Sequence, residues 1–260
     1  RGVPFQILKD EEISRQIALA AHFGKDRVRR VFLADGDALV LPTAKLLKIL
    51  QALRDTFPKL QRVSSYAAPK DILRKSEDEL RQLKEAGLQL LYYGMETGDD
   101  ATLKAVNKGV NGEEAVEAGR RVTASGMKLS IMVILGLAGK EGSYRHAIET
   151  AKAINIIQPT MWSALCLMLY RGSELLEQFE RGEFNPLSPA ELMEELYIMM
   201  ENVNLPADKH CLFRSNHISN YIPLAGTLPK DKHKLLAEIK YSAQELSKLK
   251  KWDVYNNTEY

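Results

Sequence analysis

The sequence has 260 residues, with 36 Lys plus Arg against 34 Asp plus Glu, and its formal net charge is +2. A net charge this close to zero excludes recruitment to nucleic acid or to an anionic membrane by overall charge, so we expect neither as a partner. The length suits one large α/β domain or two small ones, and we expect one domain with a substantial core.

Cysteine usage and apolar runs bear on the cellular compartment. Cys166 and Cys211 are too far apart for a C-x-x-C motif and too few for a disulfide framework, which favours a reducing compartment. The longest apolar run, "IMVILGLAG", is well short of the roughly 20 residues of a membrane span, and no signal-peptide pattern precedes it. We therefore expect a soluble, cytoplasmic protein, and an upstream part is expected to be missing because the sequence opens on Arg1 rather than Met.

Five short apolar runs lack strict polar alternation, which is typical of parallel strands that are covered on both faces. They are "VFLA" from Val31, the weaker "VSSYAA" from Val63, "LQLLYYG" from Leu88, "KLSIMVILG" from Lys128 and "MWSALCLMLY" from Met161. Segments with helical spacing lie between them, so strand and helix alternate about every 30 residues. This alternation predicts a (β/α) barrel or a doubly wound sheet.

The starts of the intervening helices are marked by capping residues. Thr43 is a candidate N-cap of the first of these helices, and Ser76 with Glu79 forms an S-x-x-E capping box for the second. Asn111 and Glu114 open a third helix in the same way. A fourth helix is indicated by the apolar stripe of Ala147, Ile148, Ala151 and Ile154.

The rhythm changes after Tyr170, where helical spacing continues without a clear strand. "SPAEL" is typical of a helix start with Pro189 at the first helical position, and an amphipathic helix is expected from about residue 230 to 249. We expect a barrel core over 1–175, helical segments packed on it over 176–250, and a loose tail over 251–260.

Glycines and polar residues collect where the predicted strands end, in "ADGDA", "SSYAAP", "YYGMETGDD" and "ILGLAGKEG". In parallel α/β folds this end carries the chemistry, because the loops there converge on one face. A glycine lets the backbone approach a ligand closely, and a carboxylate beside it can accept hydrogen bonds from an amine or from ribose hydroxyls. The strand ends are therefore the candidate binding site.

Purely structural interpretations stay open for each of these residues. Asp35 and Asp37 can shape an Asx-turn. A charge at Glu96, where an apolar run ends, is costly unless it is paired, capping or exposed for function. Glu96 or Asp99 can also favour the N-terminus of a following short helix, and Gly136 can be a turn glycine only.

Taken together and in order, the strand ends resemble the radical S-adenosylmethionine (AdoMet) superfamily, in particular its oxygen-independent coproporphyrinogen oxidases and Elongator-type enzymes. "FLADGDALVLP" is similar to the family's second-strand motif, and "YYGMETGDDATLKAVNKG" to its fourth strand and following turn. "IMVILGLAGKEGSYRHAIETAKAI" resembles its fifth strand and helix. The resemblance spans about residues 1–175 and implies a partial (β/α)6 barrel whose first strand and cysteine loop are missing here.

The resemblance implies an AdoMet-binding role for residues at these strand ends. Asp37 and the backbone near it would contact the methionine amino group, and Glu96 would bind the ribose or the amino group. Lys108 would pair with the AdoMet carboxylate, and Ile134 would adjoin adenine. AdoMet is a zwitterion with a sulfonium, so it suits one anionic handle, one cationic handle and an apolar slot. The full set is Asp35, Gly36, Asp37, Glu96, Lys108, Ile134 and Gly136.

The family's C-x-x-x-C-x-x-C motif, which supplies three thiolates to a [4Fe-4S] cluster, is absent from this sequence. "RGVPFQILKDEEI" looks like the segment that follows that motif, so the ligating cysteines are expected upstream of Arg1, with no metal ligand in this chain. The resemblance implies an oxidoreductase in which the reduced cluster cleaves AdoMet to a 5′-deoxyadenosyl radical that abstracts hydrogen from a small-molecule substrate. An electron donor such as flavodoxin or ferredoxin would be a partner.

Two further places are candidates for substrate contact. Arg214, Asn216, His217 and Asn220 form a dense polar group that is either a contact surface or a hydrogen-bonded loop tying the last helix to the barrel. Tyr66 is open between substrate contact and packing. The substrate itself is unreadable from the sequence, and a coproporphyrinogen-oxidase-like reaction rests on family analogy alone.

Two other functions remain open from the residues. A cluster-free AdoMet-binding protein or pseudoenzyme would lack the cysteines throughout. An ordinary aldolase-type barrel would need a Schiff-base lysine on a strand or a phosphate-binding glycine loop near the end of the chain. Lys128 does begin a strand, but it lies at the end opposite the expected site, which disfavours the aldolase.

Overall fold

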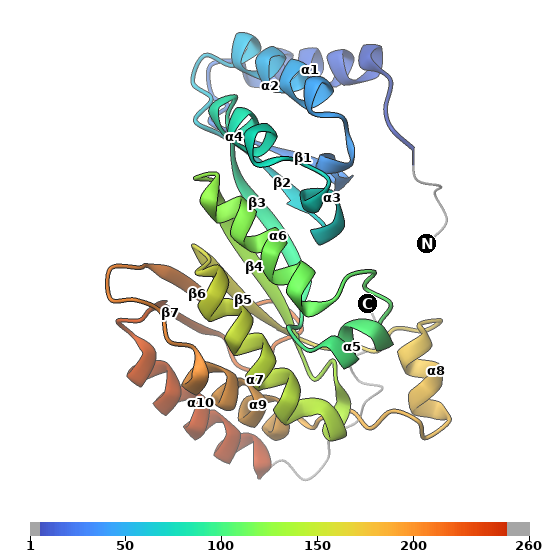
Figure 1. Ribbon diagram of the computed structural model, residues 1–260, viewed down its shortest axis with the longest axis vertical. Coiled ribbons are helices and arrows are strands. Elements are labelled where there is room, and N and C mark those ends of the chain that lie inside the picture. Colours follow the sequence, from blue (N-terminus) through green and yellow to red (C-terminus); the bar gives the residue numbers. More distant parts are fainter. Residues whose placement is uncertain (1–5, 249–260) are drawn as a thin grey trace.

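The computed structural model describes residues 6–248 (Figure 1). Its strands are β1 (Arg30–Asp37), β2 (Arg62–Ala67), β3 (Leu88–Glu96), β4 (Lys128–Leu135), β5 (Met161–Cys166), β6 (Cys211–Ser215) and β7 (Leu224–Leu228). Its α-helices are α1 (Asp10–Gly24), α2 (Thr43–Thr56), α3 (Pro69–Leu73), α4 (Glu77–Glu85), α5 (Asp100–Ala105), α6 (Gly112–Ala124), α7 (Gly139–Ile157), α8 (Glu174–Glu180), α9 (Pro189–Asn202) and α10 (Lys232–Ser247). A 3-10 turn, η1 (Ala38–Val40), follows β1.

The strands form one sheet whose spatial order is the order of the sequence, β1 to β7. Strands β1 to β6 pair in parallel, and β7 pairs antiparallel with β6. Because right-handed crossovers that always step in the same direction place their helices on one face, this order gives a singly wound sheet and not a doubly wound one. The barrel-type alternative of the sequence analysis is therefore the one that folds.

The helices form a continuous layer that follows the strands. Helices α2 and α4, α4 and α6, α6 and α7, α7 and α9, and α9 and α10 contact each other in turn. In Figure 1, α6 and α7 lie in front of the sheet, and α9 and α10 close the end that carries β6 and β7. The main core lies between this layer and the sheet, where Leu91, Tyr93 and Met95 of β3 are fully buried.

The inner face of the sheet, opposite the helices, carries partly exposed aromatic rings. Phe32 of β1 is 40% exposed and Tyr66 of β2 is 47% exposed. Their ring centroids are 4.9 Å apart, and Tyr92 of β3 contacts both rings at 5.6 and 6.2 Å. Pairs at these distances attract each other beyond simple burial, so the three rings form a defined cluster, which we call the aromatic cluster.

The predicted capping boxes are confirmed. The Ser76 hydroxyl accepts from the Glu79 amide while the Glu79 carboxylate accepts from the Ser76 amide, and Asn111 and Glu114 are joined in the same way at α6. Pro189 occupies the first turn of α9, as expected. The prediction for Thr43 was wrong: Pro42 is the N-cap of α2, and the Thr43 hydroxyl donates to Glu79 Oε1 at 2.5 Å.

The sequence analysis missed β6 and β7. Each has only five residues, and its apolar run is interrupted, by Arg214 in β6 and by Gly226 and Thr227 in β7. Because β6 pairs with β5, the sheet continues past residue 175, and the range 176–250 contributes strands as well as helices. The predicted tail, 251–260, lies outside the described residues.

No helix within residues 6–248 is long and apolar enough to cross a membrane.

Replacing Asn111 by Ala should lower the free energy of unfolding by about 1 kcal/mol, because the Glu114 amide loses its acceptor at the start of α6. Chemical denaturation monitored by circular dichroism measures the change. Asn111→Asp keeps an acceptor oxygen at the N-cap and serves as the control. Equal losses in the two variants would show that the cap does not stabilise α6.

Candidate functional site

The end of β1 has a left-handed backbone. Asp35 has a φ of 63° and Gly36 a φ of 133°, and the register with β2 shifts between Leu33 and Asp37. A positive φ is unfavourable for a residue with a side chain, and such strain is found mainly at turns and functional sites. The resulting bulge leaves Asp35 and the Gly36 backbone exposed between the ladder pair of Leu33 with Ser65 and that of Asp37 with Tyr66.

The Asp37 carboxylate links the ends of the first two strands. Its Oδ1 accepts from the Leu39 amide at 2.7 Å and its Oδ2 accepts from the Ala68 amide at 2.6 Å. Burial, with the nearby Asp71 carboxylate adding to it, raises the pKa of Asp37 to about 6. Asp37 therefore shapes the turn, as the structural interpretation states. An ionised carboxylate has about four acceptor positions, so two amides leave positions for a ligand.

Glu96 lies at the end of β3 with a φ of 65°, where the register with β4 shifts. Its Oε1 lies 2.9 Å from Lys108 Nζ, and the two side chains are 23% and 22% exposed. The carboxylate at the end of this apolar strand is therefore paired and partly open to solvent, which avoids the cost of an unpaired buried charge. The structure brings together two residues that the sequence analysis assigned to the same ligand.

Gly94 makes room for this ion pair. A Cβ at position 94 would lie 2.5 Å from Glu96 Oε1 and 3.5 Å from Lys108 Nζ. The first distance is shorter than any normal contact, so the pair can occupy this face of β3 only because residue 94 has no side chain.

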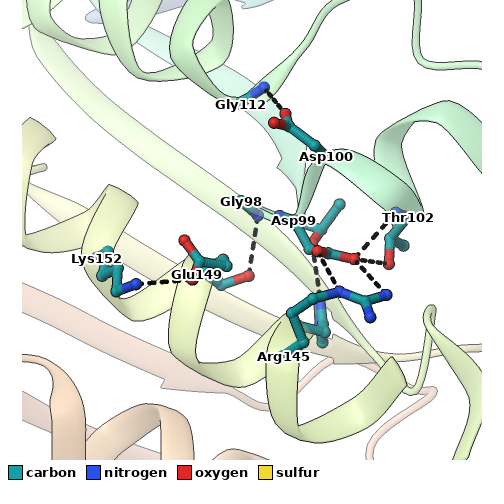
Figure 2. A network of polar contacts seen from close by, with 11 residues as sticks. Gly98, Asp99, Asp100, Thr102, Gly112, Arg145, Glu149 and Lys152 are labelled. Carbon is teal, nitrogen blue, oxygen red and sulfur yellow. Dashed lines mark hydrogen bonds and ion pairs between the residues drawn. The ribbon is translucent and has the colours of Figure 1, made fainter. Parts of the chain in front are cut away.

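Asp99 has a structural role that Glu96 does not share (Figure 2). Its side chain caps α5 by accepting from the amide and hydroxyl of Thr102, at 3.0 and 2.5 Å. It also accepts from Arg145 of α7 at 2.7 and 3.2 Å. Burial would raise the pKa of Asp99, but the hydrogen bonds from Arg145 and Thr102 outweigh it and lower the pKa. Of the two acidic residues considered as helix caps, Asp99 is the one that caps.

The turn between Glu96 and α5 packs directly against α7. The Gly98 amide donates to Thr150 Oγ1 at 2.9 Å, and a Cβ on residue 98 would lie 2.5 Å from the carbonyl oxygen of Glu149. Figure 2 shows Gly98 facing α7 at this point, with Asp99 and Arg145 beside it. These contacts fix the backbone that immediately follows Glu96, so its position is set by α7.

The loop after β4 is shaped from the side of α9. Gly136 has a φ of 79°, and its amide donates to Glu195 Oε1 at 2.7 Å. A Cβ on residue 136 would lie 2.8 Å from Leu192 Cδ2. Ile134, two residues earlier, is half-buried and lies on the inner face of the sheet, as an apolar wall for a ligand requires.

A buried pair of titratable groups lies behind this loop. His146 of α7 is fully buried, and its Nε2 lies 3.6 Å from Glu195 Oε1, while its Nδ1 lies 2.7 Å from Thr97 Oγ1. Burial lowers the pKa of His146 to about 4 and raises that of Glu195 to about 7. Both residues were missed by the sequence analysis, since nothing in the pattern of α7 or α9 separates them from surface positions.

The substrate candidates are spread over the other strands. Tyr66 belongs to the aromatic cluster, and its partners Phe32 and Tyr92 were not predicted as site residues. Arg214 faces the same side of the sheet as Gly94, because Gly94 pairs with Met132, Met132 with Ser163, and Ser163 with Arg214. One Arg214 nitrogen donates to the Phe213 carbonyl at 2.7 Å.

The loop after β6 is held by Asn220. Its side-chain amide donates to the Ala164 carbonyl at 3.1 Å and to Ser215 Oγ at 2.8 Å. Asn220 therefore ties the loop to β5 and β6, as the structural interpretation of this segment requires, although the tie is to strands and not to the last helix. Asn216 and His217 are exposed on this loop.

The residues of this chain do not fit an iron–sulfur cluster. Cys166 and Cys211 are both buried, on neighbouring strands, and burial raises the pKa of each thiol to about 12, whereas cluster ligands are thiolates. Among residues 6–248 no group of three or more His, Cys, Asp or Glu side chains is placed to hold a metal ion.

The comparison with protein families identifies the chain. Residues 1–151, more than half of the sequence, match the model of the Radical SAM superfamily. The chain therefore belongs to the radical SAM superfamily, as the motifs at the strand ends predicted.

Individual relatives and structures agree with this assignment. The heme chaperone HemW of Bacillus subtilis is 22% identical over 179 residues, which cover 68% of this chain and 46% of HemW. The solved structure of Elp3 from Methanocaldococcus infernus has a TM-score of 0.58 at 18% identity, covering 92% of this chain and 59% of that one. The coproporphyrinogen III oxidase HemN of Escherichia coli has a TM-score of 0.57 at 18% identity, covering 74% and 44%.

The solved structures confirm the α/β fold and the partial barrel, and they include a coproporphyrinogen oxidase and an Elongator-type protein, the two kinds of member that the sequence analysis named. The chain spans less than half the length of the curated relatives it matches.

Replacing Glu195 by Gln should make the protein lose stability more steeply in acid. The native pKa of Glu195 is raised from 4.5 to about 7, so the native state holds an extra proton in that window and becomes more stable as pH falls. The native pKa of His146 is lowered from 6.5 to about 4, so stability is lost as pH falls through that window. The two effects oppose each other, and the variant keeps only the second.

Denaturant titrations of both proteins at a series of pH values between about 4 and about 7 measure this difference. Parallel stability profiles for the two proteins would contradict the assignment of the raised pKa to Glu195.

Proposed function

We propose that this chain binds AdoMet at the C-terminal ends of β1, β3 and β4. The observation that carries the proposal is the ion pair between Glu96 and Lys108 at 2.9 Å on a left-handed backbone, in a chain of the radical SAM superfamily. Asp99, and not Glu96, caps the following helix, so the Glu96 carboxylate has Lys108 as its partner and stays available to a ligand.

The residues fit the charges of AdoMet. The methionine part of AdoMet carries an ammonium and a carboxylate, and Glu96 and Lys108 present the complementary charges side by side. A zwitterion that exchanges with this pair replaces one ion contact by two, and neither charge is left unpaired. Asp37, Asp35 and the Gly36 backbone would complete the contacts to the amino group, with Ile134 and Gly136 beside adenine.

The proposed substrate side is the inner face of the sheet. The aromatic cluster occupies this face over the first three strands, and Arg214 lies on it at β6. Tyr66 and Arg214 are therefore proposed substrate contacts, together with Asn216 and His217 on the loop after β6. A substrate bound there would lie across the sheet from the helix layer.

Glu96→Gln and Lys108→Ala should each weaken AdoMet binding by about 1 to 3 kcal/mol, because each leaves a charge of the ligand without its partner. Calorimetric titration of the purified protein measures the affinity. The exposed pair of Glu149 and Lys152 on α7 provides matched controls, Glu149→Gln and Lys152→Ala, which should bind as the wild type does. Wild-type affinity in both Glu96→Gln and Lys108→Ala would remove the ion pair from the site.

We further propose that the protein to which this chain belongs is a radical AdoMet enzyme, with the cluster ligands outside Arg1–Tyr260, because Cys166 and Cys211 do not fit that role. In such enzymes a [4Fe-4S] cluster supplies the electron that cleaves AdoMet. The residues of this chain would bind and orient AdoMet and exclude water from it.

The test is an anaerobic assay of the protein expressed from the whole reading frame, reconstituted with iron and sulfide and then reduced. It should release 5′-deoxyadenosine from AdoMet, and the Glu96→Gln variant should release less at subsaturating AdoMet. AdoMet binding with no 5′-deoxyadenosine, in protein shown to hold iron and sulfide, would instead identify a cluster-independent AdoMet-binding protein.

A further inference from the structure

Helix α9 brings a buried carboxylate to the loop after β4. Glu195 is 1% exposed, and both of its oxygens are used: Oε1 accepts from the Gly136 amide at 2.7 Å and Oε2 accepts from Ser143 Oγ at 2.6 Å. A buried carboxyl group is costly unless such bonds compensate it, and an apolar side chain would fill the same space without that cost. The two hydrogen bonds of Glu195 therefore have a role that apolar packing at this position could not supply.

What they fix is the shape of one loop. Gly136 begins the connection from β4 to α7, and Ser143 lies in the first turns of α7, so Glu195 joins the two ends of that connection. Leu192 lies one turn before Glu195 on the same face of α9, and its Cδ2 occupies the space where residue 136 would carry a Cβ. Together the two side chains hold Gly136 in its left-handed conformation from behind.

A buried histidine lies between this carboxylate and the end of β3. The Thr97 hydroxyl accepts from the Asp99 amide at 2.9 Å and shares a hydrogen bond with His146 Nδ1, 2.7 Å away. The other ring nitrogen of His146, Nε2, faces Glu195 Oε1 at 3.6 Å, which is too long for a hydrogen bond. A buried row of side chains therefore runs from the residue after Glu96 to the amide of Gly136.

We propose that Glu195 is a positioning residue for the adenine end of the AdoMet site, holding the Gly136 backbone so that the loop after β4 can receive the nucleoside. This role rests on the proposed function above and adds to it a residue of α9, outside the matched span 1–151. It also predicts which part of the ligand is affected, because Glu195 contacts the loop after β4 and not the ion pair at Glu96.

Two ligands separate these parts. AdoMet carries both the nucleoside and the charged methionine end, whereas 5′-methylthioadenosine carries the nucleoside without the amino acid. Glu195→Met keeps the approximate volume but removes both acceptors, so it should weaken the binding of both ligands by about tenfold. Glu96→Gln should weaken AdoMet only. Glu194→Ala, at the exposed neighbouring position of α9, is the control and should bind both ligands as the wild type does.

Rescue by the conservative variant distinguishes positioning from general stability. In Glu195→Gln the side-chain oxygen can still accept from Gly136, and its amide can donate to Ser143 Oγ, which accepts as well as donates. Glu195→Gln should therefore keep an affinity within about threefold of the wild type, while Glu195→Met does not. Thermal unfolding of each variant, with titrations done well below its midpoint, ensures that folded protein is compared.

The outcomes are separable. Wild-type affinity for both ligands in Glu195→Met, or a loss confined to AdoMet, would overturn the positioning role. If Glu195→Met does not fold, Ser143→Ala replaces it. This variant should also weaken the binding of both ligands, by a smaller factor, because one of the two hydrogen bonds of Glu195 remains. A wild-type protein that binds neither AdoMet nor 5′-methylthioadenosine would overturn the proposed function, and the role of Glu195 with it.

Discussion

The constraint on which the rest depends is the parallel pairing of strands in the order of the sequence. Because β1 to β6 run in the same direction and each neighbours the next, all of their C-terminal ends lie along one edge. The crossovers place the helices on one face of the sheet. On the other face, side chains of neighbouring strands contact each other, as in the aromatic cluster. Asp37, Glu96 and Gly136 are far apart in the sequence, yet this pairing alone sets them on one edge of one sheet.

The edge is held by contacts from behind each strand end. Asp37 ties the bulge in β1 to Ala68, the residue after β2. Asp99 and Arg145 tie the turn after β3 to α7, and Glu195 ties the loop after β4 to α9. In each case an acidic side chain accepts from backbone amides or from a cation and keeps a strained segment in place. Glu96 is the exception, since its partner is the flexible side chain of Lys108, and this makes it the carboxylate most available to a ligand.

Local signals in the sequence were sufficient where the deciding interaction is local. The capping boxes at Ser76 and Asn111 involve residues three apart, and both formed as predicted. The strand β6 could not be read in the same way, because Arg214 interrupts its apolar run and the strand is stable only through pairing with β5 and β7. Thr43 looked like a cap by residue type, but Pro42 before it already sets the entry to α2.

The candidate site divides along the same line. Residues at strand ends could be predicted, since glycine and carboxylate next to an apolar run are visible in one dimension. Glu195 and His146 could not be predicted, because each lies in an ordinary amphipathic helix. Only the fold brings Glu195 into contact with Gly136, which lies 59 residues earlier in the sequence. Tertiary contact, and not local sequence, makes these polar groups part of the site.

The role of α9 bears on how the chain is divided. A core that ended near residue 175 would leave Gly136 without the carboxylate and the leucine that shape its loop, because Leu192 and Glu195 both come from α9. It would also leave β5 as an edge strand, since β6 begins at Cys211. The segment after residue 175 is therefore part of the barrel in two physical senses: it continues the sheet, and it supports the backbone at the end of β4.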